Sequence, residues 1–432
     1  MRIDLFAPRG WAALGVVAAV SLSGLAACGG SDGSGGSSNV TTTTTDSAGV
    51  AVVSNAGAGW DTLDAWRLEP ALTVGDMEGE ASFANIGSIT IAPDGTMYVL
   101  DLQEQKIFVF DGDGNLLRKI GGQGGGPGEF TRATVVQAVG NDVVAVGEAF
   151  PPKLHLLDPE GELIESHVLE APSDIAFIGD WKITPAGEAR ILIRTFDVQA
   201  EGGGAASYLA TVSADGVIAD TITAWTRPWQ QNEPVLFQPA WVWSLGPGAS
   251  VTASPGGAYE IRSYGAAPEM ETATGGSGWT TERIVRLEHT PVPVTEEIKE
   301  AAIERIREFA SAQGAPENLV DDIIGRMKFE EFMPAIANVW VSDPGGFMWV
   351  GIPLPSAEAI NFTGGFAGGA LEGFDVFSPD GTFLGRVPAP ENFQPMVVRD
   401  DVMYGSWTDD LDVPYLRSYQ VVKGSEVLGL AP

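Results

Sequence analysis

The chain has 432 residues and a mass of 45.3 kDa, with 24 Lys and Arg residues against 57 Asp and Glu residues and a formal net charge of -33. This charge excludes nucleic acid as an expected partner, because a polyanion repels a surface of the same sign. The 55 glycines and 28 prolines predict a turn-rich chain in which long helices are rare. A hydrophobic content of 44% suffices for a large core and excludes wholesale disorder.

The first residues are typical of a secretory signal peptide. Arg2 and Arg9 precede a short apolar run, Trp11 to Leu22, and Leu25-Ala26-Ala27-Cys28 follows it. This ending resembles the lipobox of bacterial lipoproteins, which implies that residues 1–27 are removed and that lipidated Cys28 holds the protein to a bilayer of the cell envelope, outside the cytoplasm. Within that family, Gly29 favours the outer membrane over the inner one. The alternative is an ordinary cleaved signal in which Cys28, the single cysteine, has no role.

A flexible tether and then a folded body are predicted to follow the signal. Residues 28–49 are rich in Gly, Ser and Thr, and they include five consecutive threonines, Thr41 to Thr45. Such a composition indicates a flexible linker. Residues 50–432 are predicted to form the body.

The body is predicted to be all-β, because short alternating or β-branched runs are separated by turns of Asp, Pro, Asn and Gly. The first four-strand unit begins at Ile86, four further copies follow, and a last copy stops at Lys423 with only three strands. Residues 65–74 can supply the missing strand. We therefore predict a six-bladed β-propeller of four-stranded antiparallel blades, closed by an N-terminal strand. Five or seven blades are the alternatives.

Several stretches resemble a known family. The run from Ile86 to Phe130, with its VFDGDG turn and its GQGGGPGEF segment, resembles NHL-repeat six-bladed propellers, and specifically the bacterial lipoproteins that carry this domain. Trp60 and Trp66 upstream, and YEIRS and PVPVTEE downstream, extend the resemblance over residues 50–424. These motifs consist of structural glycines, aspartates and aromatic residues, so they imply a fold and say little about chemistry.

Long connections are predicted to gather on one face of the propeller. Strands alternate in direction, so the second-to-third and fourth-to-first connections share a face, and these are the long ones: residues 121–132, 195–207, 224–238, 353–372 and 406–414. Residues 295–332 are predicted to form a helical hairpin on the same face, with Thr295 as N-cap. This insertion is either a fixed cap or a lid over a ligand.

Motifs for metal binding are incomplete. Asp111, Asp113 and Asn115 have the first spacings of a calcium loop, but Leu116 and Gly122 stand where glycine and glutamate are required. The three histidines do not have the spacing of a zinc site. We therefore expect no cofactor, and the one candidate is calcium, at a group of carboxylates in a long loop. These carboxylates are Asp409, Asp410 and Asp412.

Residues suited to hold a ligand lie in or beside the long loops, where a tryptophan ring can stack and an arginine can clamp. They are Trp225, Arg227, Trp229, Gln230, Arg194, Glu148 and Trp407. No catalytic residue is assigned.

Two functions follow from this pattern. The favoured one is a monomeric, non-catalytic binding scaffold that presents its long-loop face to an envelope protein, peptide or glycan. The alternative is a calcium-dependent hydrolase or lyase, similar to propeller lactonases, with a carboxylate metal site in the central funnel.

Overall fold

The computed structural model describes residues 39–60, 64–149, 151–169, 176–184, 189–197, 204–212, 217–227, 234–267, 278–360 and 369–424. The predicted signal peptide and Cys28 lie outside these residues. Within them the chain forms six β-sheets of four or more strands, which are the blades of a propeller. The all-β prediction with six blades is confirmed.

Blades 1 to 3 follow one another along the chain, and each is a four-stranded antiparallel meander. Blade 1 contains β4 (Ile86–Ile91), β5 (Met97–Asp101), β6 (Lys106–Phe110) and β7 (Leu116–Gly121). Blade 2 contains β8 (Ala133–Val139), β9 (Val143–Ala149), β10 (Pro152–Leu157) and β11 (Leu163–Val168). Blade 3 contains β12 (Ala176–Ile183), β13 (Ala189–Asp197), β14 (Gly204–Val212) and β15 (Ile218–Arg227).

Blades 5 and 6 complete the ring. Blade 5 contains β22 (Asn338–Val341), β23 (Met348–Pro353), β24 (Leu371–Phe377) and β25 (Phe383–Pro388). Blade 6 contains β26 (Phe393–Arg399), β27 (Val402–Thr408), β28 (Pro414–Val422) and, as its outer strand, β3 (Arg67–Val74). β3 is antiparallel to β28, and Leu416 pairs with Val74. The predicted closure of the ring by an N-terminal strand is therefore confirmed.

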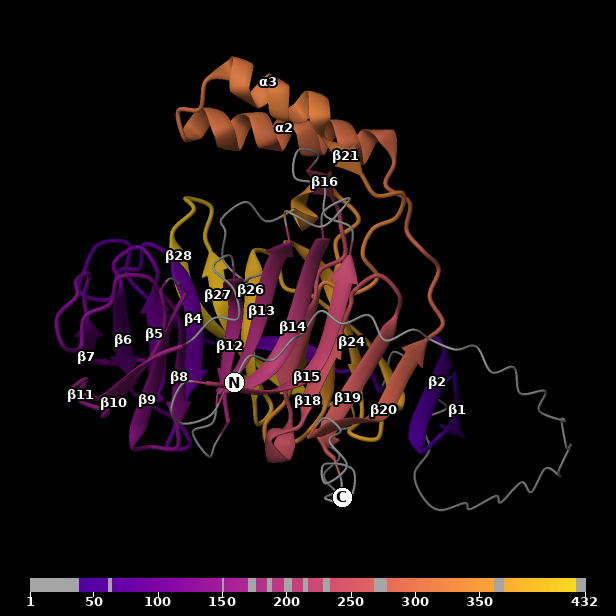
Figure 1. The fold of residues 1–432 in the computed structure, drawn as a ribbon, viewed down its shortest axis with the longest axis horizontal. Coiled ribbons are helices and arrows are strands. Elements are labelled where there is room, and N and C mark those ends of the chain that lie inside the picture. Colours follow the sequence, from indigo (N-terminus) through magenta and orange to yellow (C-terminus); the bar gives the residue numbers. More distant parts are fainter. Residues whose placement is uncertain are drawn as a thin grey trace, which may run out of the picture. The chain divides into compact units, whose positions relative to one another are not determined.

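Blade 4 is larger than predicted. It contains β17 (Val242–Leu245), β18 (Val251–Ser254), β19 (Glu260–Ala266) and β20 (Trp279–Leu287), and the short helix η1 (Pro247–Ala249) joins its first two strands. A hairpin of β1 (Val40–Ser47) and β2 (Val50–Gly57) extends this sheet to six strands, with β2 parallel to β20. Figure 1 shows the hairpin at the outside of the blades. The tether prediction is therefore wrong for Val40–Ser47.

The local sequence is compatible with the turn of this hairpin. Ala48 and Gly49 have φ angles of 54° and 89°, the left-handed pair that a two-residue turn between antiparallel strands requires. The backbone N–H of Gly49 also donates to Asp46 Oδ1 at 3.2 Å. Threonine is β-branched and favours extended backbone, so the threonine run is a suitable partner for the apolar β2.

Each boundary between neighbouring blades contains one buried apolar cluster, so six such clusters surround the ring. Alternate residues of one strand therefore enter different clusters. On β5, Val99 packs between blades 6 and 1, whereas Leu100 packs between blades 1 and 2. Burial of both faces explains why β5 is apolar from Met97 to Leu100 rather than alternating.

The helical insertion lies between blades 4 and 5. It consists of α2 (Glu296–Ala312) and α3 (Glu317–Arg326), which Figure 1 shows beyond the strand ends on one side of the blades. Thr295 is the N-cap of α2, as predicted, and its Oγ1 accepts from the N–H of Ile298 at 3.3 Å. No helix among the described residues has the length and apolarity to cross a bilayer.

Candidate functional site

The order of the strands in each blade shows which connections share one face of the propeller. The second-to-third and fourth-to-first connections of the blades lie at the same ends of the strands, and we call this the loop face. It carries the insertion with α2 and α3, the connection of residues 354–370 with η2 (Ala357–Ala359), and the connection of residues 409–413. One long connection does not follow the prediction, because residues 267–278 join the third strand of blade 4 to the fourth, at the opposite face.

The base of the helical insertion is fixed to the loop face. Ala302 of α2 is fully buried and shares an apolar cluster with Phe237, Met333 and Ala357 of η2. A short parallel pair of β16 (Val235–Leu236) and β21 (Lys328–Phe329) links the end of the insertion to the preceding loop. These contacts favour a fixed cap over a mobile lid at this end of the hairpin.

The outer end of the insertion has exposed apolar side chains. Leu319, Ile323 and Met327 recur at a spacing of four residues along the second helix and its end. Leu319 is 49% exposed and Ile323 is 37% exposed, whereas Val320 is the buried residue of α3. α3 packs against α2, and Arg307 of α2 bonds Asp321 of α3 at 2.7 Å.

Glu148, predicted as a ligand-binding residue, forms hydrogen bonds within the protein. It lies near the end of β9 at the loop face, is 2% exposed, and accepts from Thr131 Oγ1 at 2.5 Å. His155 Nε2 lies 3.0 Å from Glu148 Oε1. Burial alone raises the pKa of the Glu148 carboxyl, but the hydrogen bonds from Thr131 and His155 outweigh it, so the pKa is below its ordinary value. The carboxylate thus pins the loop before blade 2.

Asp101 has the same role at the end of β5, and sequence reasoning did not find it. Its side chain is fully buried, and Oδ2 accepts from the N–H groups of Ala84 and Asn85 at 2.6 and 3.1 Å. Oδ1 accepts from the N–H groups of Gln103 and Glu104, both at 2.9 Å. An acidic residue at the end of a second strand is the signal that could have revealed this pattern.

Trp407 lies on β27 at the loop face, but a neighbour covers its ring. The guanidinium carbon of Arg417 lies 3.3 Å from the centroid of the Trp407 ring, and Tyr415 packs at 5.7 Å between centroids. Arg417 Nε also donates to Thr73 Oγ1 of β3 at 3.1 Å. A cation already stacks on the ring that was predicted to stack on a ligand.

The proposed calcium carboxylates do not converge. Asp409 Oδ1 accepts from the N–H groups of Leu411 and Val413 at 2.9 and 3.0 Å, and Oδ2 accepts from Tyr415 Oη at 3.3 Å. These bonds, led by that from Val413, lower the pKa of the Asp409 carboxyl. Asp410 and Asp412 are exposed. Across the described residues, no three or more His, Cys, Asp or Glu side chains are grouped to hold a metal ion.

The remaining predicted residues that the structure describes lie in the strands of blade 3, where Arg194 and Trp225 both pair with Ser207 of β14. Trp225 and Arg227 lie within β15, and Arg194 lies within β13, so the loops predicted at residues 224–238 and 195–207 are shorter than expected. Trp225 packs against Trp241. Trp229, Gln230 and Cys28 lie outside the described residues.

A buried polar cluster joins blades 4 and 5, and the sequence analysis missed it. Tyr259 Oη donates to Asp375 Oδ2 at 2.7 Å, and Arg386 Nε donates to Asp375 Oδ1 at 2.7 Å. Burial, and then the charge of Asp375, raise the pKa of Tyr259 well above its ordinary value. Burial, and then the charge of Arg386, lower the pKa of His289 beside this cluster. A charged residue inside the apolar strand Leu371–Phe377 was the available signal.

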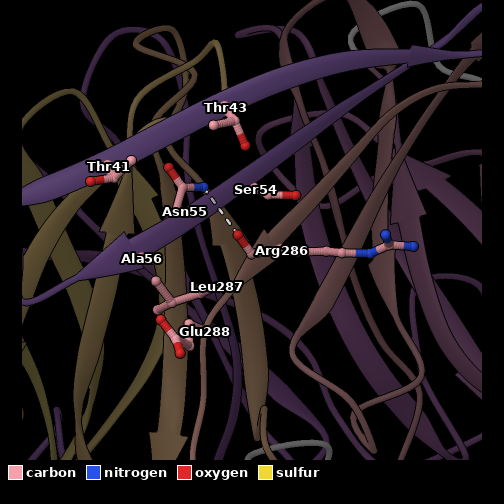
Figure 2. A pocket seen from close by; sticks show the side chains of 8 residues that line it. All are labelled: Thr41, Thr43, Ser54, Asn55, Ala56, Arg286, Leu287 and Glu288. Atoms are coloured by element: carbon pink, nitrogen blue, oxygen red, sulfur yellow. Dashed lines mark hydrogen bonds between the residues drawn. The ribbon is translucent and has the colours of Figure 1, made fainter. Parts of the chain in front are cut away.

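A groove of about 410 Å³ lies beside the N-terminal hairpin rather than at the centre of the loop face. Figure 2 shows its lining side chains, which lie on β1, β2 and β20 and, for Glu288, directly after β20. They are Thr41, Thr43, Ser54, Asn55, Ala56, Arg286, Leu287 and Glu288. Asn55 anchors this region, because its Nδ2 donates to the carbonyl oxygens of Arg286 in blade 4 and Gly381 in blade 5, at 3.1 and 3.0 Å.

Comparisons with known proteins agree with a six-bladed β-propeller. A family model described as a 6-bladed beta-propeller matches residues 78–141. An exported protein from Bacteroides fragilis is 13% identical, aligns over 86% of this chain and 100% of its own, and has a TM-score of 0.50. Regucalcin, a calcium-binding protein from Agrobacterium tumefaciens, is 14% identical over 83% of this chain and 96% of its own, with a TM-score of 0.41.

Virginiamycin B lyase from Staphylococcus aureus is 11% identical over 83% of this chain and 100% of its own, with a TM-score of 0.39. No curated protein matches the sequence. At these identities the similarities show the fold alone, so the resemblance to NHL-repeat lipoproteins stays a prediction.

Proposed function

We propose that this protein is a non-catalytic binding scaffold, held to a membrane of the cell envelope by lipidated Cys28 and facing an envelope protein, peptide or glycan with its loop face. The observation that carries this proposal is that candidate ligand-binding side chains on that face already contact other groups of the protein. Glu148 and Asp409 are bonded to neighbouring groups, and the ring of Trp407 is covered by Arg417. The described loop face is therefore a rigid platform with elaborated connections, which is the usual setting for a binding surface.

The lipid anchor has its own test. Changing Cys28 to Ser removes the thiol that would be lipidated, so we expect the protein to move from the membrane fraction to the soluble fraction. The unchanged chain is the control, fractionated in parallel and detected by immunoblot. Retention of the variant in the membrane fraction would contradict lipidation and would leave the proposed binding face unaffected.

The loop face can be tested by photo-crosslinking in intact cells. Leu411 is 69% exposed at the tip of a loop-face connection, so a photoreactive residue there would reach a bound partner. Glu160 is exposed in the turn between β10 and β11 at the opposite face, and it is the matched control. We expect a discrete adduct from position 411 and none from position 160. Adducts from both positions, or from neither, would count against the loop face.

Catalysis is the outcome that would overturn the proposal. We expect the purified protein to leave lactone and ester substrates intact, with or without added calcium. Calcium-dependent hydrolysis that disappears in an Asp409→Ala variant would instead establish the alternative, an enzyme with a carboxylate metal site.

A further inference from the structure

β1 is the outer strand of the blade 4 sheet, and one of its two edges pairs with no strand in the described part of the chain. Seven of its eight residues, from Thr41 to Ser47, are exposed. Its other edge pairs with β2 from Val40 to Ser47 without a bulge, so the backbone groups of the free edge form an uninterrupted row. Figure 1 shows this strand at the outside of the blades.

From Val40 to Thr45, the free edge of β1 lacks the features by which proteins prevent edge-to-edge pairing. Such features are charged side chains, prolines and bulges within the edge strand. The other outer strands, β7, β11, β15, β25 and β3, each contain at least one of them. The residues concerned are Arg118, Glu165, Asp220, Arg386 and Pro70. Val40 to Thr45 of β1 contain no charge, proline or glycine, and the single charge of the strand is Asp46, near its end.

We propose that β1 pairs antiparallel with β1 of a second copy of this chain, centred on Thr43, to form a symmetric dimer. The five consecutive threonines make this strand complementary to itself. With the two-fold axis at Thr43, Thr41 faces Thr45 of the second copy and Thr42 faces Thr44. Every central pair is then Thr with Thr, a combination that stabilises antiparallel strands. Such a contact is isologous and closed, so it stops at two copies.

Charge is compatible with this register. Asp46 falls opposite Val40 of the second copy, so no two like charges face each other across the new pair. The net charge of -33 on each copy opposes association, but charges farther apart than about 8 Å are largely screened at physiological ionic strength. A contact made by one strand pair lies below the roughly 1,200 Å² of stable complexes, so we expect a weak dimer that is populated at high local concentration.

This inference replaces the monomer expected from the sequence. That expectation assigned Thr41 to Thr45 to a flexible tether, which has no strand edge to offer. In the structure the same residues form part of a strand that pairs with β2 without a bulge.

Disulfide trapping tests the pairing and its register. Thr43 faces itself across the axis, and facing Cα atoms of antiparallel strands are about 4.5 to 5.5 Å apart, within the range of a disulfide. Thr41 lies about 14 Å along the strand from Thr41 of the second copy, which is too far. In the full chain carrying Cys28→Ser, we expect Thr43→Cys to form a disulfide dimer roughly tenfold faster than Thr41→Cys under mild oxidation. The Thr41→Cys/Thr45→Cys double variant should cross-link as Thr43→Cys does.

Equal rates for Thr43→Cys and Thr41→Cys, or no dimer from either, would overturn the proposal. A second measurement avoids the introduced thiols. Analytical ultracentrifugation of the full Cys28→Ser chain should show a mass that rises with concentration from one chain towards two. Thr43→Lys places two like charges face to face and should abolish this rise, whereas Ser166→Lys on the outer strand of blade 2 should not. A mass of one chain throughout, or an equal effect of both lysines, would contradict the dimer.

Discussion

Buried polar side chains of this protein form hydrogen bonds that connect strands, loops and neighbouring blades. Asn55 is 3% exposed, and it also accepts from the N–H of Phe383 at 3.0 Å and from Thr42 Oγ1 at 2.8 Å. It therefore connects both strands of the N-terminal hairpin to blades 4 and 5. Asp101 and Glu148 fasten loops in a comparable way. Buried groups of this kind must be satisfied within the protein, so each of them fixes one local arrangement.

Tyr259 gives a prediction at this scale. Because its pKa is raised in the folded protein, its contribution to stability is complete below the unfolded pKa of about 10 and is lost as the pH rises through the folded pKa. Changing Tyr259 to Phe should cost about 1 kcal/mol of unfolding free energy at pH 8, since the hydrogen bond to Asp375 is lost.

Above pH 10 the difference between the two proteins should shrink, because only the parent chain ionises Tyr259 on unfolding. Urea denaturation between pH 8 and pH 11 measures this. A difference that stays constant over the whole range would contradict the assigned role of Tyr259.

The two added elements, the N-terminal hairpin and the helical insertion, attach to the blades by different physical means. The hairpin extends a sheet through backbone pairing, with β2 parallel to β20 from Ala51 to Asn55. The insertion attaches through an apolar cluster around Ala302 and η2. Packing of close-fitting side chains is sensitive to volume, so the insertion should respond to substitution at its base more than at its surface.

Ala302 and its neighbour Ala301 test that attachment. Ala302 is fully buried against the loop face and Ala301 is exposed on the same helix, so both substitutions to Leu change the helix itself in the same way. Ala302→Leu should overpack the cluster at a cost of about 1 to 3 kcal/mol, and it should increase proteolysis within residues 296–326. Ala301→Leu should behave as the parent chain does. If both variants resisted proteolysis within residues 296–326 equally, the cluster would not be what holds the insertion in place.

At the scale of the whole folded body, the N-terminal residues close the ring. After β2 the chain crosses blade 5, where the N–H of Trp60 donates to the carbonyl oxygen of Leu384 at 2.7 Å and Trp60 stacks on Trp66 at 5.4 Å. It then supplies β3 to blade 6 and enters blade 1. The first and last parts of the sequence thus share one sheet, which leaves blade 6 incomplete without β3.

Truncation separates these contributions. A chain that begins at Ser38 keeps every described strand, and it should melt at the same temperature as the longer chain. A chain that begins at Ala58 lacks the hairpin and should melt at a lower temperature while folding cooperatively. A chain that begins at Gly75 lacks β3 and should lose cooperative melting and aggregate, because the edge of β28 is exposed. Calorimetry would contradict the role of β3 if the shortest chain melted like the longest.

The sequence by itself determined the blades and their closure, because strand and turn signals are local. Alternating runs ended by turns such as Pro93 to Gly95 mark strands wherever they stand, and a last unit with three strands requires a fourth from elsewhere. The tertiary structure alone decided what the threonine run does, since Thr41 to Thr45 becomes a strand only when β2 and blade 4 are in place to pair with it. It also decided the roles of Glu148 and Trp407, whose side chains are of the types that bind ligands. Their partners, Thr131 and Arg417, are hydrogen-bonding or stacking groups brought beside them by folding, and no local sequence pattern encodes such distances.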